Sequence, residues 1–227
     1  MRSKKAIKNV IFSLLQQIIT VICGFIVPKL IISNYGSNVN GLINSITQFL
    51  AYITLLNSGV GMVIKALLYK PLAEKNKQEI ANIFKSSEKF FRRIAIVFIF
   101  YILILCVIYP LFVNDSFGYF YTISLLLIIS ISTFAEYFFG MTYLLFIQAD
   151  QKSYVISIIQ FTTTIANSIL IVILIKLGFN IQIVKLLSAM IFVLRPFLQA
   201  LYFRKHYDID LSVAKKDYKI KQKWDAL

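Results

Sequence analysis

Long apolar stretches dominate this chain and limit it to folds that use the lipid bilayer as their solvent. Six of them lie at about residues 10–32, 41–64, 94–113, 119–147, 154–175 and 181–203. Each reaches roughly the 20 residues that a helix needs to cross about 30 Å of hydrocarbon. Charged residues make up only 15% of the chain, against about 25% in soluble domains. We therefore predict an all-α, polytopic membrane bundle of six transmembrane helices, because β-barrel strands would read as shorter, alternating segments.

The positive charges predict how the six spans are oriented. Of the 24 Lys and Arg residues, only Lys29, Lys176, Lys185 and Arg195 lie outside the segments that share the N-terminal side of the membrane. Short loops rich in Lys and Arg stay on the cytoplasmic side during insertion. Both termini are therefore expected in the cytoplasm. Residues 1–205 would form the bundle, and residues 206–227 a cytoplasmic tail or a linker to a second lobe.

Composition argues against several functional classes. The net charge of +14 is explained by orientation and by attraction to anionic membrane lipids, so nucleic acid is not an expected partner. His206 is the only histidine, and Cys23 and Cys106 fall inside predicted spans, so no metal, cofactor or Ser/His catalytic arrangement is expected. An integral-membrane enzyme would need an exposed acidic pair or a long outer loop. The sequence offers neither, and we expect no enzyme.

Polar residues inside the spans gather on one face of each helix when they are placed at about 100° per residue. These faces carry Gln16 in span one, Asn44, Gln48 and Ser58 in span two, Glu136, Gly140 and Tyr143 in span four, Gln160 and Asn167 in span five, and Lys185, Arg195 and Gln199 in span six. Such residues either hold helices together or face a water-filled cavity. Because amides and charges recur over several spans, we favour the cavity for them and helix packing for Ser and Thr.

The charged residues inside the spans are the strongest functional candidates, because each costs about 2.5 to 3.5 kcal/mol at mid-membrane. Arg195 lies about 12 Å from the inner end of its span by the helical rise, next to Pro196, which is expected to kink the helix. A guanidinium facing a cavity suits a phosphate. Lys185 either joins it or extends toward the interface. Glu136 has two open roles: a structural partner for Arg195 or Lys185, or a proton or cation site.

The inner connection between spans two and three, residues 65–93, has its own apolar periodicity. Ile80, Ile83 and Phe84 recur at helical spacing within a charged stretch. This pattern predicts an amphipathic helix that lies on the inner face of the membrane.

Short segments spread along the whole chain carry a family resemblance. They are Gly24–Leu30, Asn34–Gly36, Asn40–Leu42, Leu56–Gly61, Leu68–Lys75, Phe91–Ala95 and Arg195–Pro196. In this order they resemble the N-terminal half of polysaccharide transporters in the multidrug/oligosaccharidyl-lipid/polysaccharide exporter superfamily. The family has about twice as many spans in two lobes, so the chain is expected to be one lobe. Its ending, Trp224–Leu227, resembles the lead-in to a seventh span.

The resemblance implies a flippase for cell-surface polysaccharide biosynthesis in a bacterial-type cytoplasmic membrane. Its substrate would be a lipid-linked oligosaccharide of the undecaprenyl pyrophosphate type, moved by alternating access of a cationic central cavity. The cavity candidates are Arg195, Lys185, Asn44, Gln48, Gln160, Asn167 and Gln16. A second lobe or a second copy of the chain would complete the cavity. Two alternatives stay open: a drug/cation antiporter coupled through Glu136, and a non-transporting lobe that binds a second subunit.

Overall fold

The protein is built from long helices connected by short turns. The computed structural model describes residues 2–113 and 117–214, with side chains for all of these except residues 2–4 and 54–58. Its elements are α1 (Arg2–Tyr35), α2 (Ser37–Glu74), α3 (Lys77–Val113), α4 (Tyr119–Ala135), the π-helical turn η1 (Glu136–Gly140), α5 (Met141–Ala149), α6 (Ser153–Lys176), α7 (Ile181–His206) and the 3-10 turn η2 (Leu211–Val213). The described residues contain helices and no strands, which confirms the predicted all-α class.

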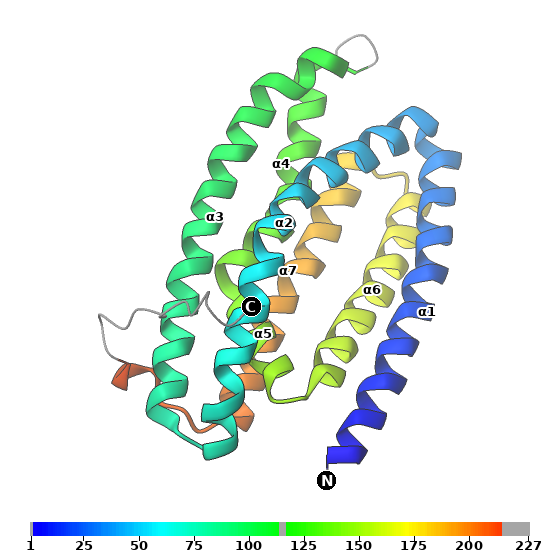
Figure 1. Ribbon diagram of the computed structural model, residues 1–227. Coiled ribbons are helices and arrows are strands. Elements are labelled where there is room, and N and C mark those ends of the chain that lie inside the picture. The colour runs from blue at the N-terminus through cyan, green and yellow to red at the C-terminus, as the bar shows by residue number, and fades with distance from the viewer. Residues whose placement is uncertain (1, 114–116, 215–227) are drawn as a thin grey trace.

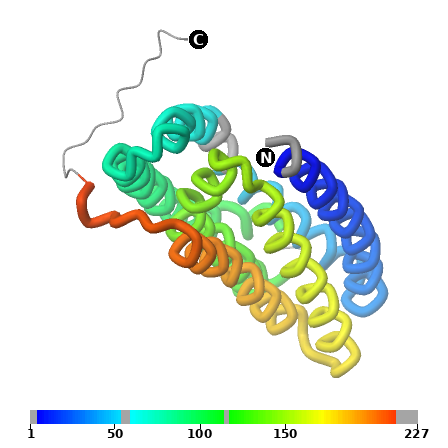
Figure 2. The backbone as a smooth tube through the Cα atoms, turned by 90° about the horizontal axis from the view of Figure 1, so that it is seen from below, coloured from blue at the N-terminus to red at the C-terminus, as the bar shows by residue number. Residues whose placement is uncertain are grey.

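The helices lie side by side and reverse direction at each connection (Figure 1). α4, η1 and α5 follow one another without a gap and form a single pass, which we call the fourth pass. The N-terminal end of α1, the turns before α3 and α6, and the end of α7 lie at one end of the bundle, which we call the inner end (Figure 1). Seen along the bundle, α6 lies between α7 and α1, and α1 stands at the edge (Figure 2).

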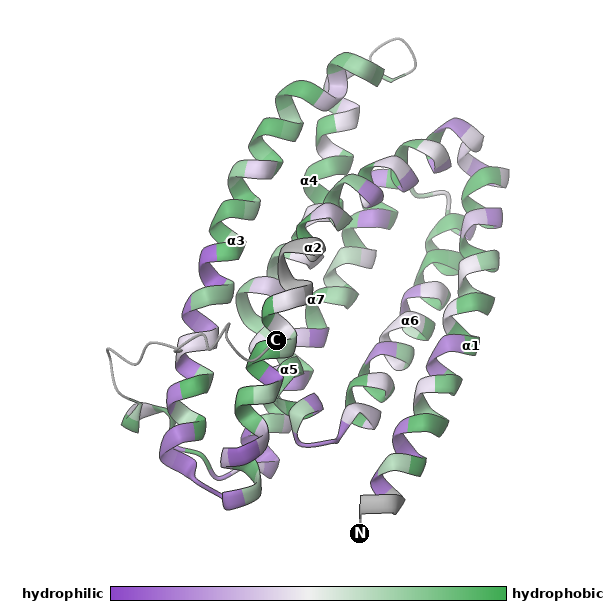
Figure 3. Cartoon of the chain, in the orientation of Figure 1, coloured by the Kyte–Doolittle hydropathy of each residue, from purple (hydrophilic) through white to green (hydrophobic). Residues whose placement is uncertain are grey.

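Five helical segments are long and apolar enough to cross a membrane. They are Lys5–Tyr35, Lys77–Val113, Tyr119–Ala149, Ser153–Lys176 and Ile181–His206. Figure 3 shows how apolar residues cover the upper part of α3 and most of α4. α2, the helix that contains the second predicted span, is not in this set. The chain therefore has the character of a multi-pass membrane protein, and the sixth span stays a prediction.

The prediction of a separate amphipathic helix in residues 65–93 is wrong. α2 continues to Glu74, and α3 starts at Lys77 after a tight turn in which Lys75 has a φ of 55°. Ile80, Ile83 and Phe84 are buried, and the Phe84 ring lies 5.0 Å from that of Phe203 at the end of α7. These apolar residues do recur at helical spacing, but their side chains face the other helices of the bundle and not a lipid surface.

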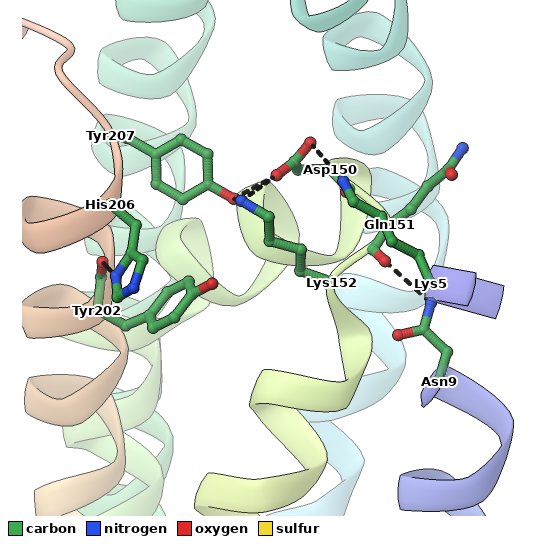
Figure 4. A network of polar contacts seen from close by, with 8 residues as sticks. All are labelled: Lys5, Asn9, Asp150, Gln151, Lys152, Tyr202, His206 and Tyr207. Carbon is green, nitrogen blue, oxygen red and sulfur yellow. Dashed lines mark hydrogen bonds and ion pairs between the residues drawn. The ribbon is translucent and has the colours of Figure 1, made fainter. Parts of the chain in front are cut away.

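A polar network at the inner end joins the ends of three helices (Figure 4). Asp150, in the turn after α5, accepts a hydrogen bond of 2.5 Å from the hydroxyl of Tyr207, just past α7. Its carboxylate also pairs with Lys152 at 2.8 Å and with Lys5 of α1 at 3.7 Å. Burial, together with the bond to Asp150, raises the pKa of Tyr207 above its ordinary value. The phenol therefore stays protonated below pH 10, and its contribution to stability is lost only at higher pH.

Polar contacts also attach α1 to α6 at both ends. Asn9 donates a hydrogen bond to the carbonyl of Gln151 at 3.0 Å and accepts one from the backbone of Tyr154 at 2.9 Å. At the opposite end, the hydroxyl of Tyr35 donates to the carbonyl of Phe179 at 2.5 Å. Most of the apolar side chains of α1 remain exposed. This surface suits contact with lipid, and the polar interior of the bundle lies elsewhere.

Candidate functional site

A change of helical register in the fourth pass shapes the site. The π-helical turn Glu136–Gly140 separates α4 from α5, and turns of this kind are frequent at functional sites. Gly140 makes the turn compatible with α7: a Cβ atom here would lie 2.8 Å from Cβ of Pro196 and 3.1 Å from the Glu136 carboxyl. The missing side chain therefore lets the fourth pass approach α7 closely and leaves room for the Glu136 carboxyl.

Arg195 of α7 is held against α6 on one side. Its Nε donates to the Thr163 hydroxyl at 2.8 Å, and its Nη2 donates to the Thr164 hydroxyl at 3.0 Å. Nη2 also reaches the carbonyl of Gln160 at 3.4 Å, and the guanidinium lies 4.3 Å from the centre of the Phe192 ring. Within the described residues, Nη1 forms no hydrogen bond. The arginine is thus fixed in place with donor capacity left for a ligand.

Glu136 meets Gln199, one helical turn beyond Arg195. Gln199 Nε2 donates to Glu136 Oε1 at 3.4 Å, and Gln199 is 1% exposed. Neither Arg195 nor Lys185 forms an ion pair with Glu136 in the described part of the chain. Of the two predicted roles for Glu136, the direct structural ion pair is therefore not observed. The carboxylate instead shares a cavity with Arg195.

Two adjoining cavities follow α7 through the bundle. The first, of 330 Å³, lies between α2, α4 and α7 and is lined by Lys185. The second, also of 330 Å³, lies between the fourth pass, α6 and α7 and is lined by Glu136, Gln160 and Arg195. The residues that line both are Ser132, Thr133 and Phe192. The cavities therefore adjoin and form one path beside α7, whose lining is mostly apolar and carries Lys185 and Arg195 about 15 Å apart along the helix axis.

Lys185 contributes a second cation to this path. No described residue forms a hydrogen bond or an ion pair with its ammonium group. It lines the first cavity. An amine without a partner in a cavity is available to an anionic ligand.

The remaining predicted cavity residues lie outside this path. Asn167 is buried, and it accepts a hydrogen bond of 2.5 Å from Ser188, so it joins α6 to α7. Asn44 and Gln48 are exposed on α2, and Gln16 is half-buried on α1. Neither cavity is lined by any of these residues. Ser58, predicted on the face of Asn44, lies outside the described side chains.

Several residues of the site were not selected from the sequence. Gln199 and Gly140 were placed on polar faces but not assigned to the site. Thr163 and Thr164 belong to the Ser and Thr residues that were assigned as a class to helix packing. Their partners explain the difference, since Gln199 contacts Glu136 and the two threonines bind Arg195. The sequence contained one indication for Gln199. It follows Arg195 by one helical turn, so the two side chains lie on the same face of α7.

Comparisons with known proteins do not identify the chain. No family model, no curated protein and no solved structure matches it.

Proposed function

We propose that this chain is one lobe of a flippase that moves a lipid-linked oligosaccharide across a bacterial-type cytoplasmic membrane for cell-surface polysaccharide biosynthesis. The observation that carries the proposal is that two cations, Lys185 and Arg195, line the path beside α7. Cations inside membrane helices are rare and mark substrate pathways. Spaced about 15 Å apart by the helical rise, they offer successive positions to an anionic head group. Pyrophosphate of the undecaprenyl pyrophosphate type fits this chemistry.

The size of the cavities limits what they hold. At 330 Å³ each, they lie at the lower end of the range for small-molecule pockets, about 300 to 1,000 Å³. A space of this size suits a compact head group such as pyrophosphate better than a long sugar chain. The chain therefore recognises the head group, while most of the oligosaccharide needs space outside it.

Exposed amides favour a second lobe or a second copy as the partner that encloses this space. Asn44 and Gln48 are exposed on α2, within the second predicted span. Amides that face hydrocarbon without hydrogen bonds are unfavourable, so such groups face protein or a water-filled cavity. Under the proposal, this face of α2 lines the gap between the two halves of the transporter.

The proposal includes six spans with both termini in the cytoplasm, and α2 is the span that needs a direct test. Its 38 residues extend about 57 Å at the helical rise per residue, enough to cross the bilayer. Single cysteines at Ser37 and Glu74, with Cys23 and Cys106 replaced by alanine, are expected to react with an impermeant maleimide from opposite sides. Labelling of both positions in intact cells would place the ends of α2 on one side and contradict the six-span topology.

A gene deletion tests the function with the protein in its own membrane. Deletion is expected to trap the lipid-linked oligosaccharide on the cytoplasmic face, and the intact gene on a plasmid is expected to restore export. The measurement is the fraction of lipid-linked sugar that an impermeant glycosidase reaches in spheroplasts. If this fraction is the same with and without the protein, the flippase proposal is wrong.

Glu136 supports a second candidate, a drug/cation antiporter of the same superfamily. Its carboxylate lines the cavity that also holds Arg195, so the site has a group that attracts cations beside one that attracts anions. Export of cationic dyes by cells without their own pumps separates the candidates. Dye export that depends on Glu136 favours the antiporter, and unchanged dye retention favours the flippase.

A further inference from the structure

Two cations and one carboxylate form a cluster on the surface of α3. Glu88 pairs with Lys85 at 2.8 Å and with Arg92 at 2.6 Å. The side chains of both cations stay close to half exposed, 43% for Lys85 and 49% for Arg92. An ammonium group has three N–H donors and a guanidinium five, so both retain donors for a further acceptor. Because one carboxylate offsets only one of the two positive charges, the cluster suits an anion.

The cluster lies where the apolar part of α3 begins. Away from the inner end, α3 changes from mainly hydrophilic to apolar residues (Figure 3). Arg92 stands directly before the apolar stretch that starts at about residue 94, and Lys85 lies about 10 Å closer to the inner end by the helical rise. When α3 crosses the membrane, the two cations are therefore at the depth of the phospholipid head groups.

An apolar strip on the fourth pass continues from the cluster into the membrane. The guanidinium of Arg92 lies 5.2 Å from the centre of the Phe138 ring, and the ring of Phe134 lies 5.4 Å from that of Phe138. Ile131 and Leu127 follow at intervals of about one turn, and both are exposed. From Phe138 to Leu127 the strip extends about 16 Å at the helical rise, close to half of the roughly 30 Å of hydrocarbon. This outward strip therefore matches one acyl chain in one leaflet.

The outward strip is separate from the two cavities beside α7. None of its four residues lines either cavity. The residues of α4 that line both cavities are Ser132 and Thr133, which lie on the opposite side of the helix at about 100° per residue. A ligand on the strip therefore uses neither cavity, and its binding does not depend on whether the chain moves a sugar lipid.

We propose that Lys85, Arg92 and the outward strip bind one anionic phospholipid from the leaflet at the inner end of the bundle. Its phosphate accepts charge-assisted hydrogen bonds from the two cations, while an acyl chain lies along the strip. A lipid with a single negative charge, such as phosphatidylglycerol, compensates the positive charge that Glu88 leaves over. Phosphatidylcholine carries its own cation beside the phosphate, so it gains less from the cluster.

Lipid binding to the purified full chain in detergent tests this site without any sugar lipid. Native mass spectrometry gives the Kd of the first bound phosphatidylglycerol, with phosphatidylcholine of the same acyl chains as the reference. We expect phosphatidylglycerol to bind more tightly, and Arg92→Gln to weaken it about fivefold, as for a half-exposed ion pair. Arg93→Gln is the matched control, because it removes the same charge from an exposed neighbour that points about 100° away around α3. Its Kd should be unchanged. Glycerol phosphate, the head group without acyl chains, should not compete.

Each other outcome overturns the proposal. Equal affinity for the two lipids means that the surface does not select anionic head groups. Equal weakening by Arg92→Gln and Arg93→Gln leaves only the general attraction between basic residues and anionic lipids. Unchanged binding by Arg92→Gln places the lipid elsewhere, and competition by glycerol phosphate removes the strip from the site. If Arg92→Gln does not fold, Lys85→Gln, which leaves Glu88 paired with Arg92, is judged by the same fivefold change. The gene deletion is scored separately, so either result can fail alone.

Discussion

Replacement of Arg195 by glutamine is expected to lower the externally accessible lipid-linked oligosaccharide by at least about tenfold, the equivalent of about 1.4 kcal/mol. Among the described residues, Arg195 is the only cation that lines the cavity of Glu136 and Gln160. Loss of its charge removes the strongest class of hydrogen bond to a phosphate. Glutamine still reaches toward Thr163 on α6, so the amount of protein in the membrane should stay the same. Impermeant glycosidase in spheroplasts measures the sugar, and immunoblotting measures the protein.

Two further variants separate the role of this arginine from the effect of charge alone. Arg204→Gln removes the same charge from the exposed last turn of the same helix, and export should remain normal. Arg195→Lys keeps the positive charge but loses the planar guanidinium group that binds α6. Export should therefore lie between that of the unaltered protein and that of Arg195→Gln. Full export by Arg195→Gln at normal abundance would remove the arginine from the proposed mechanism.

The membrane character of the chain was predictable because hydropathy is a local property. Five of the six predicted spans coincide with helices that are long and apolar enough to cross a membrane. The ends of the helices were not predictable from the same signal. α2 and α3 continue well past the apolar stretches, as far as Glu74 and Lys77, because packing against other helices replaces lipid there. Ile80 and Phe84 therefore looked amphipathic in the sequence and are buried in the bundle.

The polar faces were predictable only while the helices kept a regular period. A phase of 100° per residue placed Glu136, Gly140 and Tyr143 on one face. The π turn from Glu136 to Gly140 adds a residue and shifts every later side chain around the axis. As a result, the Tyr143 ring lies 5.1 Å from that of Phe84 and 5.3 Å from that of Phe203. No hydropathy pattern signals this shift, since it depends on the contact between Gly140 and Pro196.

The periodicity of polar residues in a helix also does not predict whether they face another helix or a cavity. Asn167 and Gln160 share a face of α6, yet Asn167 bonds to Ser188 and Gln160 lines a cavity. The partner helix decides between these outcomes, and its position is a property of the whole bundle. Lys185 and Arg195 each line a cavity, because a charged side chain inside a span is far less costly in a polar or water-filled space than in hydrocarbon.

Gly140→Ala is expected to destabilise the protein by about 1 to 3 kcal/mol, the usual range for overpacking in a rigid site. The new methyl group would lie 2.8 Å from Cβ of Pro196, and a proline ring cannot rotate away. Either α7 moves or the π turn distorts, and both displace the Glu136 carboxyl, which is 3.1 Å from the same position. For a chain of this size, Tm should fall by roughly 2 to 4 °C for each kcal/mol. Thermal unfolding in detergent measures this change.

Gly41→Ala is the matched control, because the sign of its effect should be opposite. Gly41 also lies inside a helix, and an added Cβ there would meet nothing within 4 Å. Without a clash, alanine in place of glycine favours the helix by up to about 1 kcal/mol. If Gly140→Ala also raises Tm, the fourth pass and α7 do not approach each other as closely as the structure shows. In that case the position of Glu136 beside Gln199 loses its structural support.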